Sequence, residues 1–194
     1  MNYLAHIHLA HVSQTSLLGN FLGDFVKGSN LDHLPTSLQH GIRLHRKIDS
    51  YTDNHPVVKS LRKQFSANLR RMSGVMIDIY FDHLLSLHWP SFTVQPQQVV
   101  LSAFYQQLKE EPSKHSQHFA SVRAGLLKHQ WLQNYNERKS CLGAYQQIEK
   151  RLNRRIEFAQ EGYQFMNLYH AQIEQDFLAF YPELIHYVQT VELD

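Results

Sequence analysis

The segment Ile77–Trp89, IDIYFDHLLSLHW, decides the fold class of this chain. Most of its residues are large and apolar, and their spacing around a helix leaves almost no face for water. Two carboxylates, Asp78 and Asp82, and two imidazoles, His83 and His88, nevertheless lie within it. A helix that is apolar nearly all round is buried, so these polar side chains must face other protein groups or a bound ligand.

The two acids of this segment lie on the same side of the helix. At about 100° per residue, Asp78 and Asp82 are about 40° apart. Ionised carboxylates in such apolar surroundings cost several kcal/mol each unless they are paired. A divalent cation is one source of the opposite charge, and a buried Arg43 or Arg46 is another. The spacing of this pair leaves both interpretations open.

A second predicted helix carries the same chemistry. In LQHGIRLHRKIDSYTDNHP, residues 38–56, Leu38 and Ile42 define an inward face, and His45 and Asp49 fall on that face at positions i and i+4. This is the spacing for two ligands of one metal ion. The chain has a single cysteine, so a metal would be held by imidazole and carboxylate, a donor set that favours Mn²⁺ or Mg²⁺ over Zn²⁺ or Fe²⁺.

The N-terminal segments give weaker signals. Asp24, in GNFLGDFVKG (residues 19–28), lies off the main apolar arc, between glycines that would let another helix approach closely. It can reach a site between helices or lie on the surface as an ordinary acid. His6 and His8 stand among aliphatic residues, and a lone histidine is more often a hydrogen-bonded core residue than a ligand. The spacing therefore assigns these two histidines no role.

Composition predicts one globular domain over residues 1–194. Apolar residues make up 43% of the 194 and charged residues 19%, which is typical of a folded chain with its own core. The net charge of +2 is too small to predict binding to nucleic acid. We find no apolar run long enough to insert into a membrane and no secretory signal. With its single cysteine, the chain is predicted to be cytoplasmic.

The rest of the chain has the apolar spacing of helices, interrupted mostly by prolines. The stretch AHIHLAH, residues 5–11, also fits a strand, but a strand without a partner is not stable alone. We therefore predict an all-α fold, a single-domain helical bundle, with its last helix bent at Pro182. The predicted helices are Thr15–Lys27, Thr36–Asp53, Val57–Arg71, Gly74–Trp89, Pro96–Glu110, Ser116–Asn134, Ser140–Gln160 and Gly162–Val188.

Six blocks of sequence, in order, resemble a known family. They are NYLAHIHLAH (2–11), GNFLGDFVKG (19–28), LHRKIDSYTDNHP (44–56), DIYFDHLLSLHW (78–89), QWLQNY (130–135) and FYPEL (180–184). The set resembles the bacterial acyl carrier protein phosphodiesterases, also called acyl carrier protein hydrolases. The resemblance runs from Asn2 to about Pro182, and its first four blocks are long and unusual enough to be specific.

The resemblance implies an activity and a relationship. Members are cytoplasmic hydrolases that depend on Mn²⁺, or on some other divalent cations, and cleave the phosphodiester between 4′-phosphopantetheine and a serine of holo-acyl carrier protein. They are regarded as distant relatives of the all-α HD-domain phosphohydrolases, so a distorted HD-like bundle is expected. HD proteins carry a His-Asp doublet, whereas here the order is Asp82-His83. The HD motif therefore does not assign individual ligands in this chain.

The matching blocks suggest roles for particular residues. Metal ligands are expected among the acids and the imidazole of these blocks: Asp24, His45, Asp49 and Asp82. His83 and Asp78 are expected in acid/base catalysis, and Arg43 and Arg46 on the phosphate. Acyl carrier proteins are strongly acidic, so exposed basic clusters become candidates for docking the substrate. These clusters are Arg70-Arg71 and Lys150-Arg151 with Arg154-Arg155.

Two other functions remain open from the sequence. One is a metal-dependent phosphohydrolase that acts on a nucleotide or another small phosphodiester. The other is a helical binding module without catalytic activity, in which the buried histidines and aspartates form only a polar network. Metal binding would separate the second from an enzyme, and a comparison of substrates would separate the first.

Overall fold

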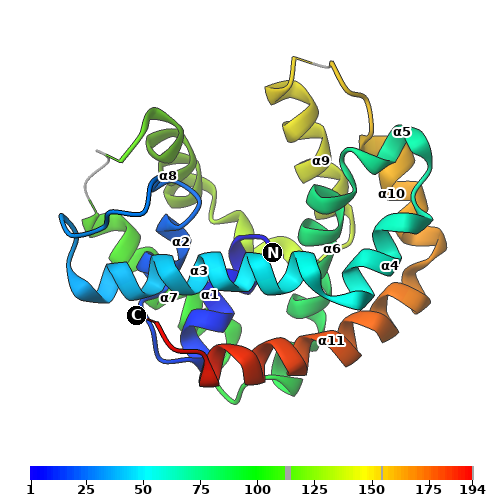
Figure 1. Ribbon diagram of the computed structural model, residues 1–194. Helices are drawn as coiled ribbons and strands as arrows, with labels where there is room; N and C mark the ends of the chain where they lie inside the picture. The colour runs from blue at the N-terminus through cyan, green and yellow to red at the C-terminus, as the bar shows by residue number, and fades with distance from the viewer. Residues whose placement is uncertain (112–114, 154, 194) are drawn as a thin grey trace.

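The structure is a computed structural model that describes residues 1–111, 115–153 and 155–193. Within these residues it contains helices and no strand, which confirms the predicted all-α class (Figure 1). The α-helices are α1 (Tyr3–Val12), α2 (Leu17–Leu22), α3 (Thr36–Asn54), α4 (Pro56–Gln64), α5 (Ala67–Arg70), α6 (Ser73–His88), α7 (Gln97–Glu110), α8 (Gln117–His129), α9 (Lys139–Arg151), α10 (Ala159–Leu168) and α11 (His170–Thr190). The 3₁₀ helices are η1 (Trp89–Ser91) and η2 (Trp131–Asn136).

The stretch that also fitted a strand, residues 5–11, is helical and belongs to α1. Residues 4–10 are all buried, so this helix has no solvent face. It packs against α2, α3, α6, α7 and α11, which surround it. The period-two alternation of histidine and aliphatic residues therefore carries no information about a sheet, because both kinds of side chain are inside the protein.

Several predicted helices end earlier in the structure than expected. Ser16 caps α2, and the helix ends at Leu22 rather than at Lys27. The predicted helix Val57–Arg71 is broken at Phe65, whose backbone is extended. Gln130, in the left-handed region, ends α8 and begins η2.

The C-terminal third differs most from the prediction. The predicted helix Ser140–Gln160 ends at Arg151, and α10 begins only at Ala159. The carboxylate of Glu149 accepts hydrogen bonds from the backbone N–H groups of Phe158 and Ala159, which satisfies the first donors of the new helix. α11 continues through Pro182 in its interior.

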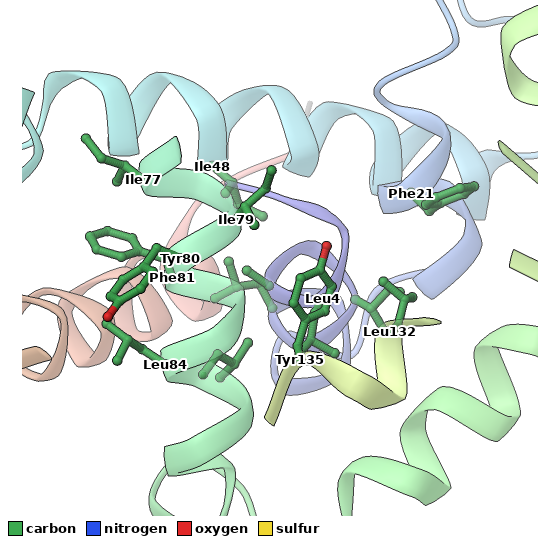
Figure 2. Close-up of a cluster of buried hydrophobic side chains, with 14 of the residues drawn as sticks. Leu4, Phe21, Ile48, Ile77, Ile79, Tyr80, Phe81, Leu84, Leu132 and Tyr135 are labelled. Atoms are coloured by element: carbon green, nitrogen blue, oxygen red, sulfur yellow. The ribbon is translucent and has the colours of Figure 1, made fainter. Parts of the chain in front are cut away.

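The core forms around α6, the helix of the decisive segment. Figure 2 shows Ile77, Tyr80 and Phe81 on one side of α6, and Leu4 of α1 and Leu132 of η2 on the other side of this helix. Each of these five residues is fully buried. They belong to one hydrophobic cluster that reaches through the described residues from α1 to α11. Burial of α6 on nearly all sides confirms what its composition predicted.

Two glycines bring α2 and α3 into close contact. A Cβ atom on Gly41 would lie 2.6 Å from the backbone nitrogen of Asn20, and one on Gly19 would lie 2.9 Å from the Cα of Leu38. Real Cβ atoms do not approach backbone atoms this closely, so both positions require glycine. These contacts hold the middle of α2 against the first turns of α3, one turn before His45.

None of the described helices combines the length and the hydropathy that crossing a bilayer requires.

Candidate metal centre

Three side chains from two helices converge on one point. His6 comes from α1, and His45 and Asp49 come from α3. The Nε2 atom of His6 lies 3.1 Å from Oδ1 of Asp49, and Nε2 of His45 lies 3.1 Å from Oδ2. One potential ligand atom from each residue lies within 4.8 Å of the other two. Two imidazoles and a carboxylate at this separation are a donor set for a divalent cation.

The tautomer of His6 supports a cation at this point. Its Nδ1 atom lies 2.8 Å from Oδ1 of Asn20, so with the amide in this orientation Nδ1 carries the hydrogen and donates it. The lone pair of Nε2 then faces the carboxylate of Asp49, and two acceptors 3.1 Å apart repel each other. A metal ion between them would convert this repulsion into two favourable bonds.

The pKa values in this group point the same way. Burial lowers the pKa of His6 to about 4, with a further contribution from the neighbouring His45. The His6 ring is therefore neutral near pH 7, as a metal ligand must be. Burial raises the pKa of Asp49, but the hydrogen bond with His45 and the nearby ammonium of Met1 outweigh burial and hold the pKa well below its usual value. The carboxylate is thus ionised and the imidazole is not.

Close packing fixes the ring of His45. It stacks on the ring of His6, with centroids 3.9 Å apart and planes 18° from parallel. On its other side the backbone of Gly23 is so near that a Cβ atom there would lie 2.2 Å from Cγ of His45. The imidazole is held between another ring and a bare backbone, so its Nε2 is aimed at Asp49 with little freedom.

A pocket of about 330 Å³ lies beside these ligands. Its polar lining includes Asp24, Lys27, His45, Arg46 and Asp49. Oδ1 of Asp24 lies 3.8 Å from Nε2 of His45, so this predicted ligand is near the group without contacting it directly. The pocket thus places two cationic side chains next to the candidate metal ligands, which is an arrangement suited to a phosphate ester.

The two arginines predicted to bind phosphate lie differently. Arg46 lines the pocket, and its guanidinium donates hydrogen bonds to the carbonyls of Val26 and Gly28, at 3.2 and 2.7 Å. Arg43 is partly buried on the same helix and does not line the pocket. The structure therefore associates Arg46 with the site more closely than Arg43.

Asp78 lies near the candidate ligands through a shared partner. Its Oδ1 atom is 3.3 Å from the amino group of Met1, which is also 3.4 Å from Oδ1 of Asp49. Burial raises the pKa of Asp78, although the ammonium of Met1 opposes this. A carboxyl that holds its proton to higher pH suits the predicted role in acid/base catalysis, which stays a prediction.

Asp82 and His83 lie outside the group of three. The carboxylate of Asp82 is fully buried and accepts hydrogen bonds from the N–H groups of Leu4 and Ala5 and from the side chain of Asn2, each at 2.9 Å. Burial raises its pKa to about 7, although the two backbone donors oppose this. Nδ1 of His83 donates to the carbonyl of Tyr135 at 2.6 Å. Their roles as ligand and catalyst stay predictions.

These bonds give Asp82 a definite structural effect. Its carboxylate on α6 satisfies the first free N–H groups of α1, the helix that carries His6. We expect Asp82→Ala to lower the free energy of unfolding of the metal-free protein by about 3 kcal/mol, since buried donors lose their acceptor. Asp82→Asn, which keeps one acceptor, should lose about half as much.

Denaturant unfolding of metal-free protein measures this effect. If Asp82 were only a metal ligand, the metal-free Asp82→Ala and wild-type proteins would have the same free energy of unfolding. The two proteins would then differ in stability only when metal is present. That result would contradict the role we give to the Asp82 carboxylate.

The residue that sequence reasoning missed is His6. The signal was present, because His6 lies in a segment with no solvent face, like the acids of α6. Its neighbour His8 is as deeply buried, but its ring contacts the hydroxyl of Tyr181 and the edge of Trp89. Spacing along α1 does not distinguish these two histidines; only the position of α3 does.

Comparison with known proteins gives a consistent result over the whole chain. A family model described as acyl carrier protein phosphodiesterase matches residues 1–184. A protein of that name from Yersinia pestis is 35% identical over 197 aligned residues, covering 100% of both chains. One from Salmonella agona is 31% identical over 186 residues, covering 95% of this chain and 96% of its own. No solved structure matches the chain, so the predicted likeness to HD domains stays a prediction.

Proposed function

This chain belongs to the acyl carrier protein phosphodiesterase family, and we propose that it hydrolyses holo-acyl carrier protein to apo-acyl carrier protein and 4′-phosphopantetheine. Water attacks phosphorus, the bond from phosphorus to the serine oxygen breaks, and that oxygen takes up a proton. The substrate is taken from the name of the relatives. The candidate metal ligands and the cationic side chains at the pocket are groups that suit the cleavage of a phosphodiester.

The observation that carries this proposal is the group of His6, His45 and Asp49 at the edge of a pocket that Arg46 and Lys27 also line. A bound divalent cation, which we propose to be Mn²⁺ or another hard ion such as Mg²⁺, would polarise the phosphate and lower the pKa of a coordinated water. His6, His45 and Asp49 would hold the ion, with Asp24 as the next nearest carboxylate.

The residues around the ion have separate tasks. Arg46 lies at the pocket with its guanidinium fixed on two carbonyls, and it would orient the phosphate group. Asp78, with its raised pKa, is our candidate for giving a proton to the departing serine oxygen. The stacked rings and the close backbone of Gly23 keep the ligands in position, so the site does not reorganise during the reaction.

The direct test is the conversion of holo- to apo-acyl carrier protein, followed by the mobility shift of the carrier protein and by mass spectrometry of the released product. Activity should appear on adding Mn²⁺ to metal-free enzyme and disappear with a chelator. Parallel assays with nucleotides and small phosphodiesters address the rival substrate class. Hydrolysis of those compounds without conversion of the carrier protein would contradict the proposal.

The basic cluster at the end of α9 is our candidate for docking the acidic substrate. Burial and the nearby Asp24 raise the pKa of Tyr3, whereas Arg151 lowers it, so the charge of Arg151 acts on Tyr3 at the start of α1. Lys150 and Arg151 occupy the last turn of α9 and are exposed. Arg154, predicted in the same cluster, lies outside the described residues.

We expect Arg151→Glu to raise KM for holo-acyl carrier protein about fivefold and to leave kcat nearly unchanged, because one exposed charge contact contributes about 1 kcal/mol. The difference from wild type should shrink as salt is added. Lys63→Glu, an exposed reversal on α4, is the matched control and should change KM little. An equal effect of both variants would indicate net charge rather than docking at α9.

We also propose that the protein acts in the cytoplasm and binds no nucleic acid. The family resemblance and the single cysteine predict the first, and the small net charge of +2 predicts the second.

A further inference from the structure

A second group of imidazoles surrounds a carboxylate between α6 and α11, among residues that the proposed reaction does not use. His88 ends α6, His170 begins α11, and Glu174 follows one turn later. Nε2 of His88 lies 2.7 Å from Oε1 of Glu174, and Nε2 of His170 lies 3.7 Å from Oε2. All three side chains are about a quarter exposed, so solvent ions can reach them.

Unlike the His6, His45 and Asp49 group, these three residues do not bring one potential ligand atom each within 4.8 Å of the other two, so an ion here requires a side-chain rotation. A separation of 3.7 Å between His170 and Glu174 is too long for a hydrogen bond. It is close to the ~3.4 Å that separates two ligands of a tetrahedral ion with bonds of ~2.1 Å. The two imidazoles also face different oxygens of the carboxylate. For an ion bound to Oε2 and the His170 nitrogen, His88 would have to break its bond to Oε1 and rotate toward the ion.

Neighbouring groups orient the cluster in the way that supports metal ligands. Nδ1 of His170 lies 2.9 Å from the hydroxyl of Tyr80, which fixes the ring with its Nε2 toward Glu174. A hydrogen bond on the other ring nitrogen is the usual support of a metal-binding histidine. Tyr80 is itself fully buried in the core, so its hydroxyl is a rigid partner.

A third imidazole stands beside the cluster. Nδ1 of His83 faces a carbonyl, which can only accept, so the hydrogen is on Nδ1 and the lone pair is on Nε2. Among the described residues, this Nε2 is buried without a hydrogen-bond partner. Both His170 and Glu174 are close enough to influence the pKa of His83. Beside the cluster there is therefore an imidazole nitrogen, Nε2 of His83, whose lone pair is not used in a hydrogen bond.

We propose that His88, His170 and Glu174 form a second metal site, distinct from the His6, His45 and Asp49 group, that binds a borderline transition-metal ion such as Zn²⁺. Two imidazoles and one carboxylate suit that class of ion, and three protein ligands leave a position open to solvent. An ion there would join the C-terminal end of α6 to the first turn of α11. This proposal does not depend on the proposed phosphodiesterase activity.

The test uses a background in which the first site is disabled, His45→Ala with Asp49→Ala. Metal-free protein of this background is titrated with Zn²⁺ by calorimetry and, in parallel, with Co²⁺ by absorption spectroscopy. We expect one equivalent of Zn²⁺ to bind, with a rise in Tm. Adding Glu174→Gln or His170→Ala should weaken binding by at least about 100-fold, since even outer partners of ligands matter by 10- to 100-fold.

The same helix offers a matched control. Glu183 pairs with one imidazole, that of His55, at 3.3 Å, so Glu183→Gln removes a similar ion pair without removing a second histidine. It should leave Zn²⁺ binding unchanged. Unchanged binding in both Glu174→Gln and His170→Ala would overturn the proposal, as would a background protein that binds no Zn²⁺. Neither result bears on hydrolysis of the carrier protein, which is assayed separately in the chain with its first site intact.

Discussion

Asp49→Ala is expected to abolish the Mn²⁺-dependent hydrolysis of holo-acyl carrier protein, with kcat/KM lower by a factor on the order of 10³ or more. Among the residues that the structure describes, Asp49 is the one carboxylate that contacts both His6 and His45, each at 3.1 Å. Without it, two imidazoles remain and the group of three loses its carboxylate. A loss of about 4 kcal/mol of transition-state stabilisation corresponds to this factor. Steady-state kinetics with a titration of Mn²⁺ measures it.

Stability separates this effect from misfolding. The pKa of Asp49 is lowered in the folded protein, so its carboxylate stabilises the fold above the unfolded pKa of about 3.8. That contribution is lost as the pH falls through the folded pKa. Asp53→Ala is the control, one turn further along α3, where the carboxylate pairs with Arg62 at 2.7 Å. A folded Asp49→Ala protein with wild-type activity would exclude this metal centre.

Gly23→Ala is expected to lower kcat/KM by about 100-fold in a protein that still folds. The backbone of Gly23 is right-handed helical (φ −53°, ψ −31°), so alanine fits it without strain. The methyl group, however, would lie 2.2 Å from Cγ of His45 and 2.5 Å from its Cβ. The imidazole must move by an ångström or more, and misplacement of that size costs about 100-fold. Mn²⁺ affinity should fall with activity.

Gly143→Ala is the matched control for this substitution. A Cβ atom on Gly143, in α9, meets nothing within 4 Å. Alanine there should stabilise the helix by up to about 1 kcal/mol and leave the kinetics unchanged. A Gly23→Ala enzyme with the wild-type KM, kcat and Mn²⁺ affinity would show that the His45 ring is free to move, contrary to its position between Gly23 and His6.

The fold class could be predicted because it depends on local properties of each segment. The apolar surround of α6 and the faces of α3 follow from residue order and helix geometry alone. Helix ends were less predictable where a distant group supplies the cap. Glu149 begins α10 from nine residues away, and no periodicity in 140–160 indicates that bond.

In the candidate site too, positions within one helix could be predicted, and positions that depend on a second helix could not. His45 and Asp49 were predicted as partners, because four residues on one helix fix their relative position. Asp82 was expected among the ligands from the matching blocks, a role that stays a prediction, and the structure shows in addition that its carboxylate caps α1. His6 was assigned no role, yet it completes the group. In both cases the missing information was which helix lies opposite which face.

The sequence by itself determined the all-α class, the burial of α6, and the placement of His45 and Asp49 on one face of α3. These follow from forces that act within one helix, where the backbone sets every spacing. Only the tertiary structure decided that α1 brings His6 to Asp49, and that the carboxylate of Asp82 accepts hydrogen bonds from the N-terminal backbone of α1. That choice depends on packing between helices, where glycine contacts such as Gly41 on Asn20 set the distance and no local pattern encodes the partner.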